Sequence, residues 1–347
     1  MNNRQLQSQE SYYEFKQFRN NTGYNIAHKY SVGGYRSNFK TQSINLANNI
    51  KNKLKRTDQA QSLRQRAKSN DDFNNLSKKA VKCIAIASGK GGVGKTLISV
   101  NLALSLSTKY KKKVLLVDAD LGLANADIVL GIEPKYSMQD CIFKGKPLSE
   151  VVIKTEHGLD LIAVSSGNKE MVSLGAARLE MFLKELINFA ANYDIILFDC
   201  AAGIDNNVTS FIATAPQTII VASTEPTSIM DVYALNKLIY RDNLSQNVGL
   251  IVNMADDKEH GYRVAKTLSS VSKKHLNVQV HLHGVISRSE AVHEAVCKRQ
   301  PFYFSCKDQS IIEDIDNIAK DIILSHKSET KLHSLNTDKF IDGIIKG

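Results

Sequence analysis

A short glycine-rich segment, Gly89 to Thr96, has the residue types and spacing of a phosphate-binding loop. It reads GKGGVGKT and fits the pattern G-x-x-x-x-G-K-[S/T]. Glycines let the backbone wrap a phosphate chain, so that consecutive N–H groups face the anion. Lys95 lies where its ammonium reaches the β- and γ-phosphates, and the Thr96 hydroxyl is placed to ligate Mg²⁺. The predicted loop consists of Gly89, Lys90, Gly91, Gly92, Val93, Gly94, Lys95 and Thr96.

Carboxylates end two apolar runs further along the chain. Asp199 ends DIILFD, and Asp118 and Asp120 end KVLLVDAD. A carboxylate at the end of a strand beside the loop holds magnesium directly or through water, which is the role we expect for Asp199. Asp120 is expected to orient the attacking water or the metal. The alternative is that these carboxylates are structural and only cap their strands.

The elements that position these residues are visible in the apolar pattern from Val81 onward. Short runs rich in Val, Ile and Leu alternate with longer segments of helical spacing. The runs do not alternate with polar residues, which is typical of strands buried on both faces. Repetition of strand and then helix predicts an α/β domain over residues 81–326, with a mostly parallel sheet and helices on both faces. Together with the loop, this pattern predicts a P-loop NTPase.

Composition narrows the cellular context. The chain has 347 residues, 43% of them hydrophobic, and no apolar run of about 18 residues that would span a membrane. The first residues contain no apolar stretch typical of a secretory signal. Five scattered cysteines without a C-x-x-C pair indicate a reduced, cytoplasmic protein without a disulfide framework or zinc site. His281 and His283, in VQVHLHGVI, are interpreted as ordinary strand residues.

Charge and composition divide the remainder of the chain. Residues 1–80 hold 15 of the 45 basic residues but 5 of the 35 acidic ones, so the rest is balanced. A neutral body argues against broad binding of nucleic acid. Residues 1–42 are polar and expected to be disordered. Residues 43–80 show helical spacing at Leu46, Ile50 and Leu54. Residues 327–347 are expected to combine a polar linker with a short C-terminal helix.

The motifs together resemble the deviant Walker A ATPases of the MinD and ParA class over residues 81–326. The resemblance rests on KGGVGKT, DADLGLANAD and DCAAGI. It implies ATP and Mg²⁺ as ligands, slow ATP hydrolysis used as a switch, and an ATP-bound homodimer. One lysine is enough to hold a phosphate. The resemblance implies that the second, Lys90, crosses the dimer interface to the partner's nucleotide, and that Asn253 contacts adenine.

The sequence departs from this class at two places. Ala201 stands where the class usually has Gly or Pro, and Ile286–Ser289 reads ISRS where the class commonly has I-P-x-D. These departures concern the surroundings of the nucleotide and not the phosphate loop itself. The adenine contacts are therefore less well defined by the resemblance than the phosphate contacts.

A branch of the class is indicated by DQAQSLR, Asp58 to Arg64. It resembles the activating motif of the flagellar-number regulators, the FlhG/FleN family, which stimulate the signal-recognition-type GTPase FlhF. The segment Thr224–Lys237 resembles the same branch. A glutamine on a short helix can orient water in a GTPase site, and an arginine can anchor on an acidic surface. The resemblance thus implies FlhF binding through Asp58, Gln59, Gln61, Leu63 and Arg64.

The C-terminal residues carry an apolar face at helical spacing. Members of this branch end in a membrane-targeting helix, which implies a cytoplasmic protein that cycles to the inner face of the cytoplasmic membrane. The alternative is a frayed tail or a strip packed on the domain. The predicted membrane-facing residues are Phe340, Ile341, Ile344 and Ile345.

Several other functions stay open from the sequence. A MinD-type division-site ATPase would share the tail, and a ParA-type DNA-partitioning ATPase would use the basic N-terminus on nucleic acid. A scaffold that binds nucleotide without hydrolysis is a further alternative, as is an electron-transfer ATPase with a cysteine-bound cluster. The sequence also leaves open whether flagellar basal-body or transcriptional partners are contacted.

Overall fold

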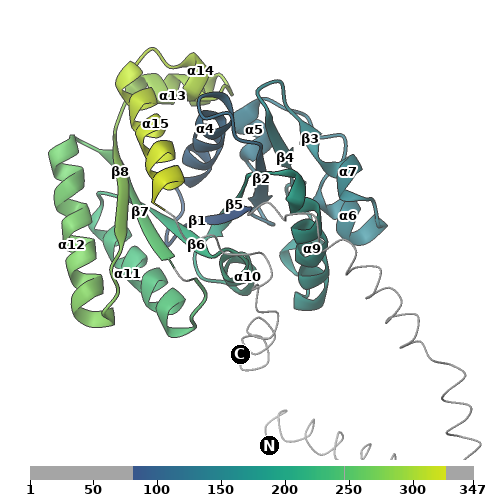
Figure 1. The fold of residues 1–347 in the computed structure, drawn as a ribbon, viewed down its shortest axis with the longest axis horizontal. Coiled ribbons are helices and arrows are strands. Elements are labelled where there is room, and N and C mark those ends of the chain that lie inside the picture. The colour runs from purple at the N-terminus through teal and green to yellow at the C-terminus, as the bar shows by residue number, and fades with distance from the viewer. Residues whose placement is uncertain (1–80, 246, 326–347) are drawn as a thin grey trace, which may run out of the picture. The chain divides into compact units, whose positions relative to one another are not determined.

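One mixed sheet runs through the centre of the domain in the computed structural model, which describes residues 81–245 and 247–325 (Figure 1). Its eight strands lie in the order β3-β4-β2-β5-β1-β6-β7-β8. Neighbouring strands are parallel except for β3, which is antiparallel to β4. The expected α/β fold with a mostly parallel sheet is confirmed. The strands are β1 (Lys82–Ser88), β2 (Val114–Ala119), β3 (Ile153–Lys154), β4 (Leu159–Ile162), β5 (Ile195–Ala202), β6 (Gln217–Ser223), β7 (Asn247–Ala255) and β8 (His281–Ser287).

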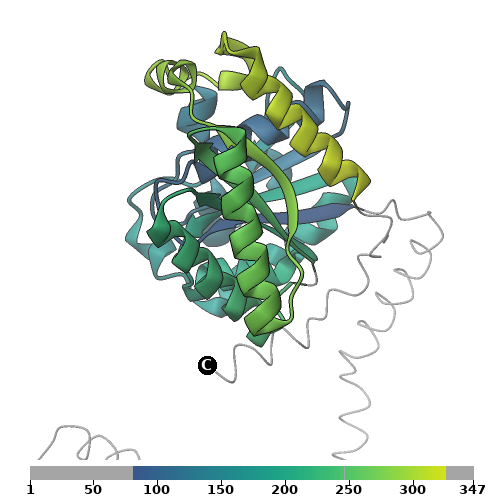
Figure 2. The ribbon, with the colours of Figure 1, turned by 90° about the vertical axis from the view of Figure 1, so that its left-hand side faces the viewer.

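Helices cover both faces of the sheet and bury two apolar cores (Figures 1 and 2). One face carries α4 (Lys95–Thr108), α5 (Ala126–Leu130), α13 (Glu290–Cys297), α14 (Phe302–Ser305) and α15 (Gln309–Leu324). The other carries α6 (Met138–Lys144), α7 (Leu148–Val151), α8 (Lys169–Val172), α9 (Ala176–Phe189) with the 3₁₀ turn η2 (Ala190–Asn192), α10 (Asn206–Thr214), α11 (Pro226–Arg241) and α12 (Lys258–Leu276).

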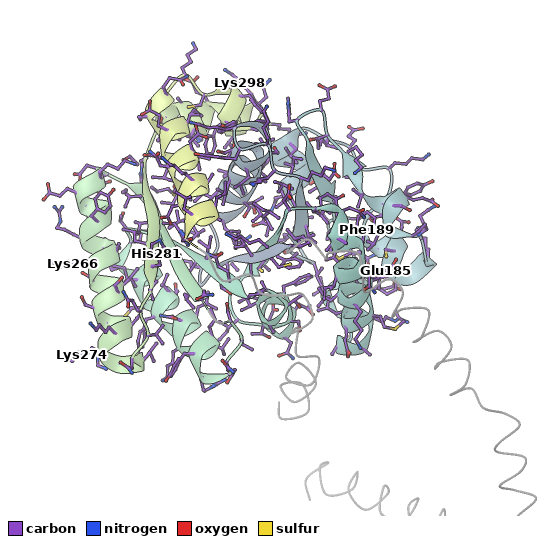
Figure 3. The ribbon with its side chains drawn as sticks, viewed as in Figure 1. Glu185, Phe189, Lys266, Lys274, His281 and Lys298 are labelled. Atoms are coloured by element: carbon purple, nitrogen blue, oxygen red, sulfur yellow. The ribbon has the colours of Figure 1, made fainter. Side chains whose placement is uncertain are left out.

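Strand burial follows from this two-layer cover. In β1, Ile84 and Ile86 belong to the core under α4, whereas Ala85 belongs to the core on the opposite face. Both faces of a central strand must therefore be apolar, which explains the unbroken Val, Ile and Leu runs. The outer helices are amphipathic instead. Figure 3 shows Lys266 and Lys274 on the solvent side of α12, while its Leu268 is buried.

Short elements are where the structure departs from the pattern. The apolar run 159–166 contains only the four-residue strand β4, and β3 is a two-residue strand without a periodic signal. The run 278–287 is in a strand only from His281 onward. The short helices α5, α6, α7, α13 and α14 span no more than eight residues, too few for a clear helical period.

The parallel arrangement collects the predicted site residues at one edge of the sheet. Strand β5 lies between β1 and β2, and Asp118 of β2 is the register partner of Asp199 of β5. The carboxyl end of β1 leads into the glycine-rich loop, which connects β1 to α4. Ligand sites in open α/β sheets lie at this edge. No described helix is long and apolar enough to cross a membrane.

Candidate active site

The glycine-rich loop joins β1 to the N-terminus of α4 and depends on two backbone conformations that favour glycine. Gly92 has φ 80° and Gly94 has φ 82°. A Cβ on Gly94 would also lie 2.4 Å from the amide nitrogen of Asn253. Gly89 has an equally firm constraint, since a Cβ there would lie 2.6 Å from the backbone of Asp231 in α11. The loop is thus held closely between α11 and β7, with the N–H groups of α4 at its end.

Lys95 forms a buried ion pair with Asp199. Its Nζ lies 2.7 Å from Asp199 Oδ1, and Lys95 and Asp199 are 8% and 1% exposed. Burial by itself lowers the pKa of Lys95, but the charge of Asp199 and the hydrogen bond to it outweigh burial, and the pKa is raised. Lys95 is therefore a charged group held at the end of β5, beside the loop in which the sequence predicts a phosphate.

The other oxygen of Asp199 is available for an additional ligand. Ser99 Oγ donates to Oδ1 at 2.8 Å, whereas Oδ2 is buried without a hydrogen-bond partner among the described residues. The Ser88 hydroxyl, at the end of β1, is also buried and without a partner there. Orphaned oxygens of this kind fit Mg²⁺ or its bound water, because magnesium takes oxygen ligands. The sequence predicts that Thr96, Asp120 and Asp199 would hold this ion.

Asp118 and Asp120 have different surroundings. Asp118 is buried and accepts N–H groups from Asp120, Asn125 and Ala126, each at 3.1 Å. Burial, followed by the charge of Asp199, raises the pKa of Asp118 to about 7. Asp120 is half-buried and accepts from Gly122 and Leu123 at 3.2 and 2.9 Å. Asp118 thus shapes the loop after β2, while Asp120 is the partly exposed carboxylate of the two.

Lys90 contacts the start of α11 and not Asp199. Its Nζ lies 2.8 Å from Glu225 Oε2 and 3.3 Å from Thr227 Oγ1. The hydrogen bond and charge of Glu225 raise the pKa of Lys90. Both side chains of this ion pair are exposed, so solvent screens it and little free energy holds it together. The two lysines of the loop therefore differ in their surroundings: Lys95 forms a buried ion pair and Lys90 an exposed one.

A cavity of about 510 Å³ adjoins the loop on the side of β7 and β8. Asn253 lies on its wall and donates through Nδ2 to Val93 O at 2.8 Å. The amide thus anchors the loop, and its expected contact with adenine stays a prediction.

The sequence did not predict the apolar wall of this cavity, because the residues of the wall come from separate elements. The only signal was the departure at Ile286–Ser289, which lies here. The wall includes Leu97, Met254, Ile286 and Val292.

Exposed apolar side chains surround the same edge of the sheet. They lie in segments that follow the carboxyl ends of β2, β4, β5 and β6, and each is more than half exposed. Because the carboxyl ends of parallel strands share one edge of the sheet, these side chains lie on the side of the sheet that carries the loop. The four residues are Leu123, Val172, Ile204 and Met230.

The predicted partner motif at Asp58–Arg64 and the predicted membrane residues 340–345 lie outside the described residues.

Comparison with known proteins agrees with this geometry. A family model described as an AAA domain matches residues 81–251. The antiactivator FleN of Pseudomonas aeruginosa is 38% identical over 223 residues, 64% of this chain and 79% of that protein. The flagellum site-determining protein YlxH of Helicobacter pylori is 33% identical over 253 residues, 72% of this chain and 83% of that protein.

A solved structure shows the same fold. The septum site-determining protein MinD of Pyrococcus horikoshii, complexed with Mg-ADP, matches with a TM-score of 0.60 at 22% identity. The match covers 72% of this chain and 99% of the MinD chain. The sheet, the loop and the Lys95–Asp199 pair define an ATPase of the MinD/ParA class. Within that class, the chain belongs to the FlhG/FleN family.

The buried pair gives a prediction for Lys95→Met. Without its cation, Asp199 keeps a buried charge, so the nucleotide-free protein should lose about 3 kcal/mol of unfolding free energy. Asp199→Asn in the same chain should restore most of this loss. Urea unfolding followed by circular dichroism measures both. If the double variant were as unstable as Lys95→Met alone, the unpaired charge of Asp199 would not be the cause of the loss. ATP turnover should be lost in both variants.

Proposed function

We propose that this ATPase is a switch in which ATP and Mg²⁺ drive a face-to-face homodimer that controls the number or placement of flagella. The observation that carries the proposal is the exposed position of Lys90, whose ammonium contacts Glu225 at the start of α11 and not the buried carboxylate that Lys95 contacts. The exposed Leu123, Val172, Ile204 and Met230 around the site support a face that a second subunit covers. The flagellar role is supported by the names of FleN and YlxH.

Each residue has a distinct part in this proposal. Lys95 exchanges Asp199 for the β- and γ-phosphates, and the backbone N–H groups of the loop hold their oxygens. Mg²⁺, when bound by Thr96, Asp120 and Asp199, supplies charge neutralisation at the phosphates. Asp120 orients the attacking water. Lys90 leaves Glu225 and contacts the partner's nucleotide, so ATP binding and dimerisation are coupled.

A pair of variants tests the dimer. Lys90→Ala should still bind ATP but remain monomeric with Mg²⁺ and a non-hydrolysable ATP analogue, since the trans contact is lost. Glu225→Gln removes the competing ion pair and keeps Lys90, so it should dimerise at least as well as the wild type. Light scattering coupled to size-exclusion chromatography gives the masses. Dimerisation of Lys90→Ala equal to that of the wild type would refute the role of Lys90.

Stimulation of the FlhF GTPase belongs to the same proposal and is assigned to the motif Asp58–Arg64. Its support is the sequence resemblance and membership of the FlhG/FleN family. A glutamine from this motif would orient water in the GTPase site, and Arg64 would anchor the segment.

The motif is tested by FlhF GTP turnover with the full chain. The wild type should stimulate hydrolysis, and the double variant Gln59→Ala, Gln61→Ala should reduce this stimulation at least tenfold while ATP binding is unchanged. Gln65→Ala, four residues on from Gln61, is the matched control and should behave like the wild type. Equal stimulation by all three proteins would rule out the motif as activator and reopen a division-site or partitioning role.

Membrane residence is assigned to Phe340, Ile341, Ile344 and Ile345. Full burial of four such side chains is worth ~6–12 kcal/mol, and ordering about nine residues costs a similar amount. One tail therefore binds weakly, whereas the two tails of an ATP-bound dimer gain avidity. ATP would thus control residence at the inner face of the cytoplasmic membrane.

Co-sedimentation with anionic lipid vesicles tests the tail. The wild type should bind with ATP and release after hydrolysis, and Ile344→Asp should remain in the supernatant, because a charge opposes insertion of the apolar face. Ser334→Asp adds the same charge in the polar linker and should still bind. Vesicle binding by Ile344→Asp at the wild-type level, with or without ATP, would exclude the tail as the anchor.

A further inference from the structure

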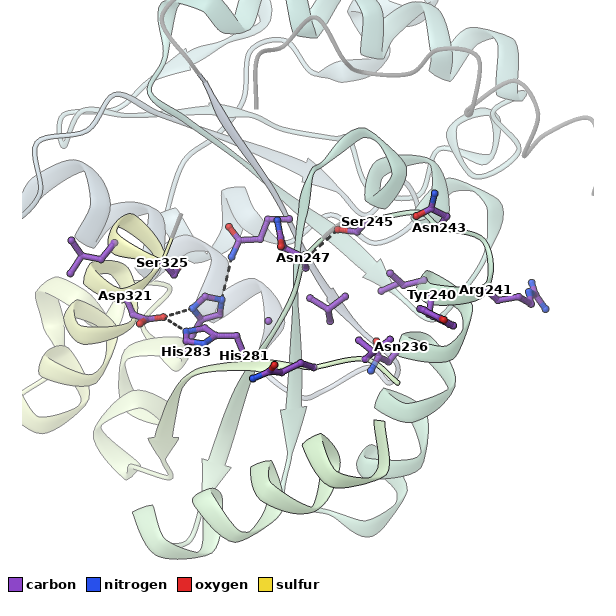
Figure 4. Close-up of a pocket in the computed structure, with 17 residues that line it drawn as sticks. Asn236, Tyr240, Arg241, Asn243, Ser245, Asn247, His281, His283, Asp321 and Ser325 are labelled. Carbon is purple, nitrogen blue, oxygen red and sulfur yellow. Dashed lines mark hydrogen bonds and ion pairs between the residues drawn. The ribbon is translucent and has the colours of Figure 1, made fainter. Parts of the chain in front are cut away.

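A hollow of about 1040 Å³ lies at the edge of the sheet opposite the glycine-rich loop (Figure 4). Its wall is formed by the amino-terminal ends of β6, β7 and β8, by the carboxyl-terminal part of α11 with the turn that follows it, and by the last turn of α15. In a parallel arrangement these ends are remote from the carboxyl ends that carry the nucleotide site. None of the residues assigned above to ATP lines the hollow, so a ligand here would be separate from the ATPase site.

Two histidines and one aspartate converge at the wall of this hollow. Asp321 Oδ2 lies 2.8 Å from His281 Nε2 and 2.6 Å from His283 Nδ1. The side chain of His283 is 1% exposed, whereas that of His281 is 55% exposed and faces solvent. One ligand atom from each of the three residues lies within 4.8 Å of the others. Among the described residues, no other three His, Cys, Asp or Glu side chains form such a group.

The backbone makes room for this group. The pairing of β7 with β8 shifts after Leu250 and Leu282, so His283 is an extra residue in β8. Bulges of this kind redirect a side chain next to a site. A Cβ on Gly249 would lie 2.3 Å from His283 Nε2, so glycine is needed in β7 beneath the ring. A Cβ on Gly284 would lie 2.6 Å from Ile318, so glycine here also lets α15 bring Asp321 close.

Gln217 is a buried polar group that faces the second nitrogen of His283. Its Nε2 lies 3.2 Å from His283 Nε2, and the residue is 4% exposed. Its Oε1 is buried and makes no hydrogen bond with any residue that the structure describes. Exchange of the amide oxygen and nitrogen would let Oε1 accept a proton from His283 Nε2. That tautomer leaves the lone pair of His283 Nδ1 directed at Asp321.

We infer that His281 Nε2, His283 Nδ1 and the Asp321 carboxylate bind a transition-metal dication of the Zn²⁺ class, with its remaining position open to the hollow. Imidazole nitrogens favour Zn²⁺, Co²⁺ or Ni²⁺ over Mg²⁺, which takes oxygen ligands. Three protein ligands and one open position form a common four-coordinate arrangement. Gln217 is a positioning residue that holds the His283 tautomer, as carbonyl oxygens do around metal-bound histidines.

Binding requires no net loss of a proton from neutral histidines. The proton that His283 Nδ1 shares with Asp321 moves to Nε2 of the same ring. The Nε2–H group then donates a hydrogen bond to Gln217 Oε1. The proton on His281 Nε2 moves to its other ring nitrogen. Both vacated lone pairs then face the metal, together with the Asp321 oxygen that had accepted the two hydrogen bonds. The hydrogen-bonded cluster and the metal-bound cluster thus use the same three atoms.

Zinc binding by the full-length, nucleotide-free chain tests this inference. The protein is treated with a chelator, dialysed, kept under a thiol-free reductant and titrated with Zn²⁺ in a calorimeter. The wild type should bind one Zn²⁺ per chain. His281→Ala and Asp321→Asn should lose this binding or weaken it at least tenfold. His281 is exposed, so its substitution leaves the core intact, which circular dichroism verifies.

A matched control removes a competing pair on α13. His293 Nε2 lies 3.7 Å from Cys297 Sγ on an exposed helix surface, and His293→Ala should bind Zn²⁺ like the wild type. Gln217→Met should weaken binding 10–100-fold with unchanged stoichiometry. Absence of binding by the wild type, undiminished binding by His281→Ala, or loss of binding in His293→Ala would each overturn the assignment. These readouts do not depend on ATP turnover or on the proposed flagellar function.

Discussion

The Lys95–Asp199 ion pair is the interaction on which the nucleotide edge of this protein depends. It connects the glycine-rich loop to the end of β5, across the boundary between two central strands. Both groups are buried, so a charge on either one is costly unless the other group, or a replacement for it, compensates that charge. A phosphate chain is such a replacement for Asp199 as the partner of Lys95. The pair is therefore both a structural tie and a ready exchange partner for the substrate.

The two lysines of the loop show how burial divides roles between identical side chains. Lys95 is enclosed by the core and has one buried carboxylate partner, whereas Lys90 makes an exposed contact with Glu225. A buried pair is costly to break, and an exposed pair is screened by water. The exposed pair is exchanged at little cost for a group on another molecule, whereas the buried pair is exchanged only when a comparable charge replaces the lost partner. This difference underlies the assignment of Lys90 to a neighbouring subunit.

The parallel sheet also separates two chemical environments. Its carboxyl edge collects Asp118, Asp120 and Asp199 beside the loop, where oxygen ligands suit Mg²⁺. Its amino edge collects His281, His283 and Asp321, where imidazole nitrogens suit softer ions. Strand direction keeps these groups apart, because in parallel strands the carboxyl ends lie at one edge of the sheet and the amino ends at the other. The sheet thus places the proposed magnesium ligands and the proposed zinc ligands at opposite edges.

Local sequence determined the parts of this protein that short segments encode. The loop Gly89–Thr96, the carboxylates Asp120 and Asp199, and the unbroken apolar strands were predictable, because backbone conformation and burial on both faces leave direct marks on neighbouring residues. The family resemblance added the expected contact of Lys90 with the nucleotide of a second subunit, which no local rule supplies. Short helices and β3 left no periodic mark.

Tertiary structure decided which distant residues meet. His281 and His283 read as ordinary strand residues, since Asp321 lies 38 residues after His283 and approaches only when α15 packs on β8. The contact of Asn253 with Val93, and the cavity walled by Leu97 and Ile286, likewise require β7 and β8 beside the loop. Spacing along a chain specifies local conformation, but contacts between separate elements depend on how the whole sheet and its helices pack.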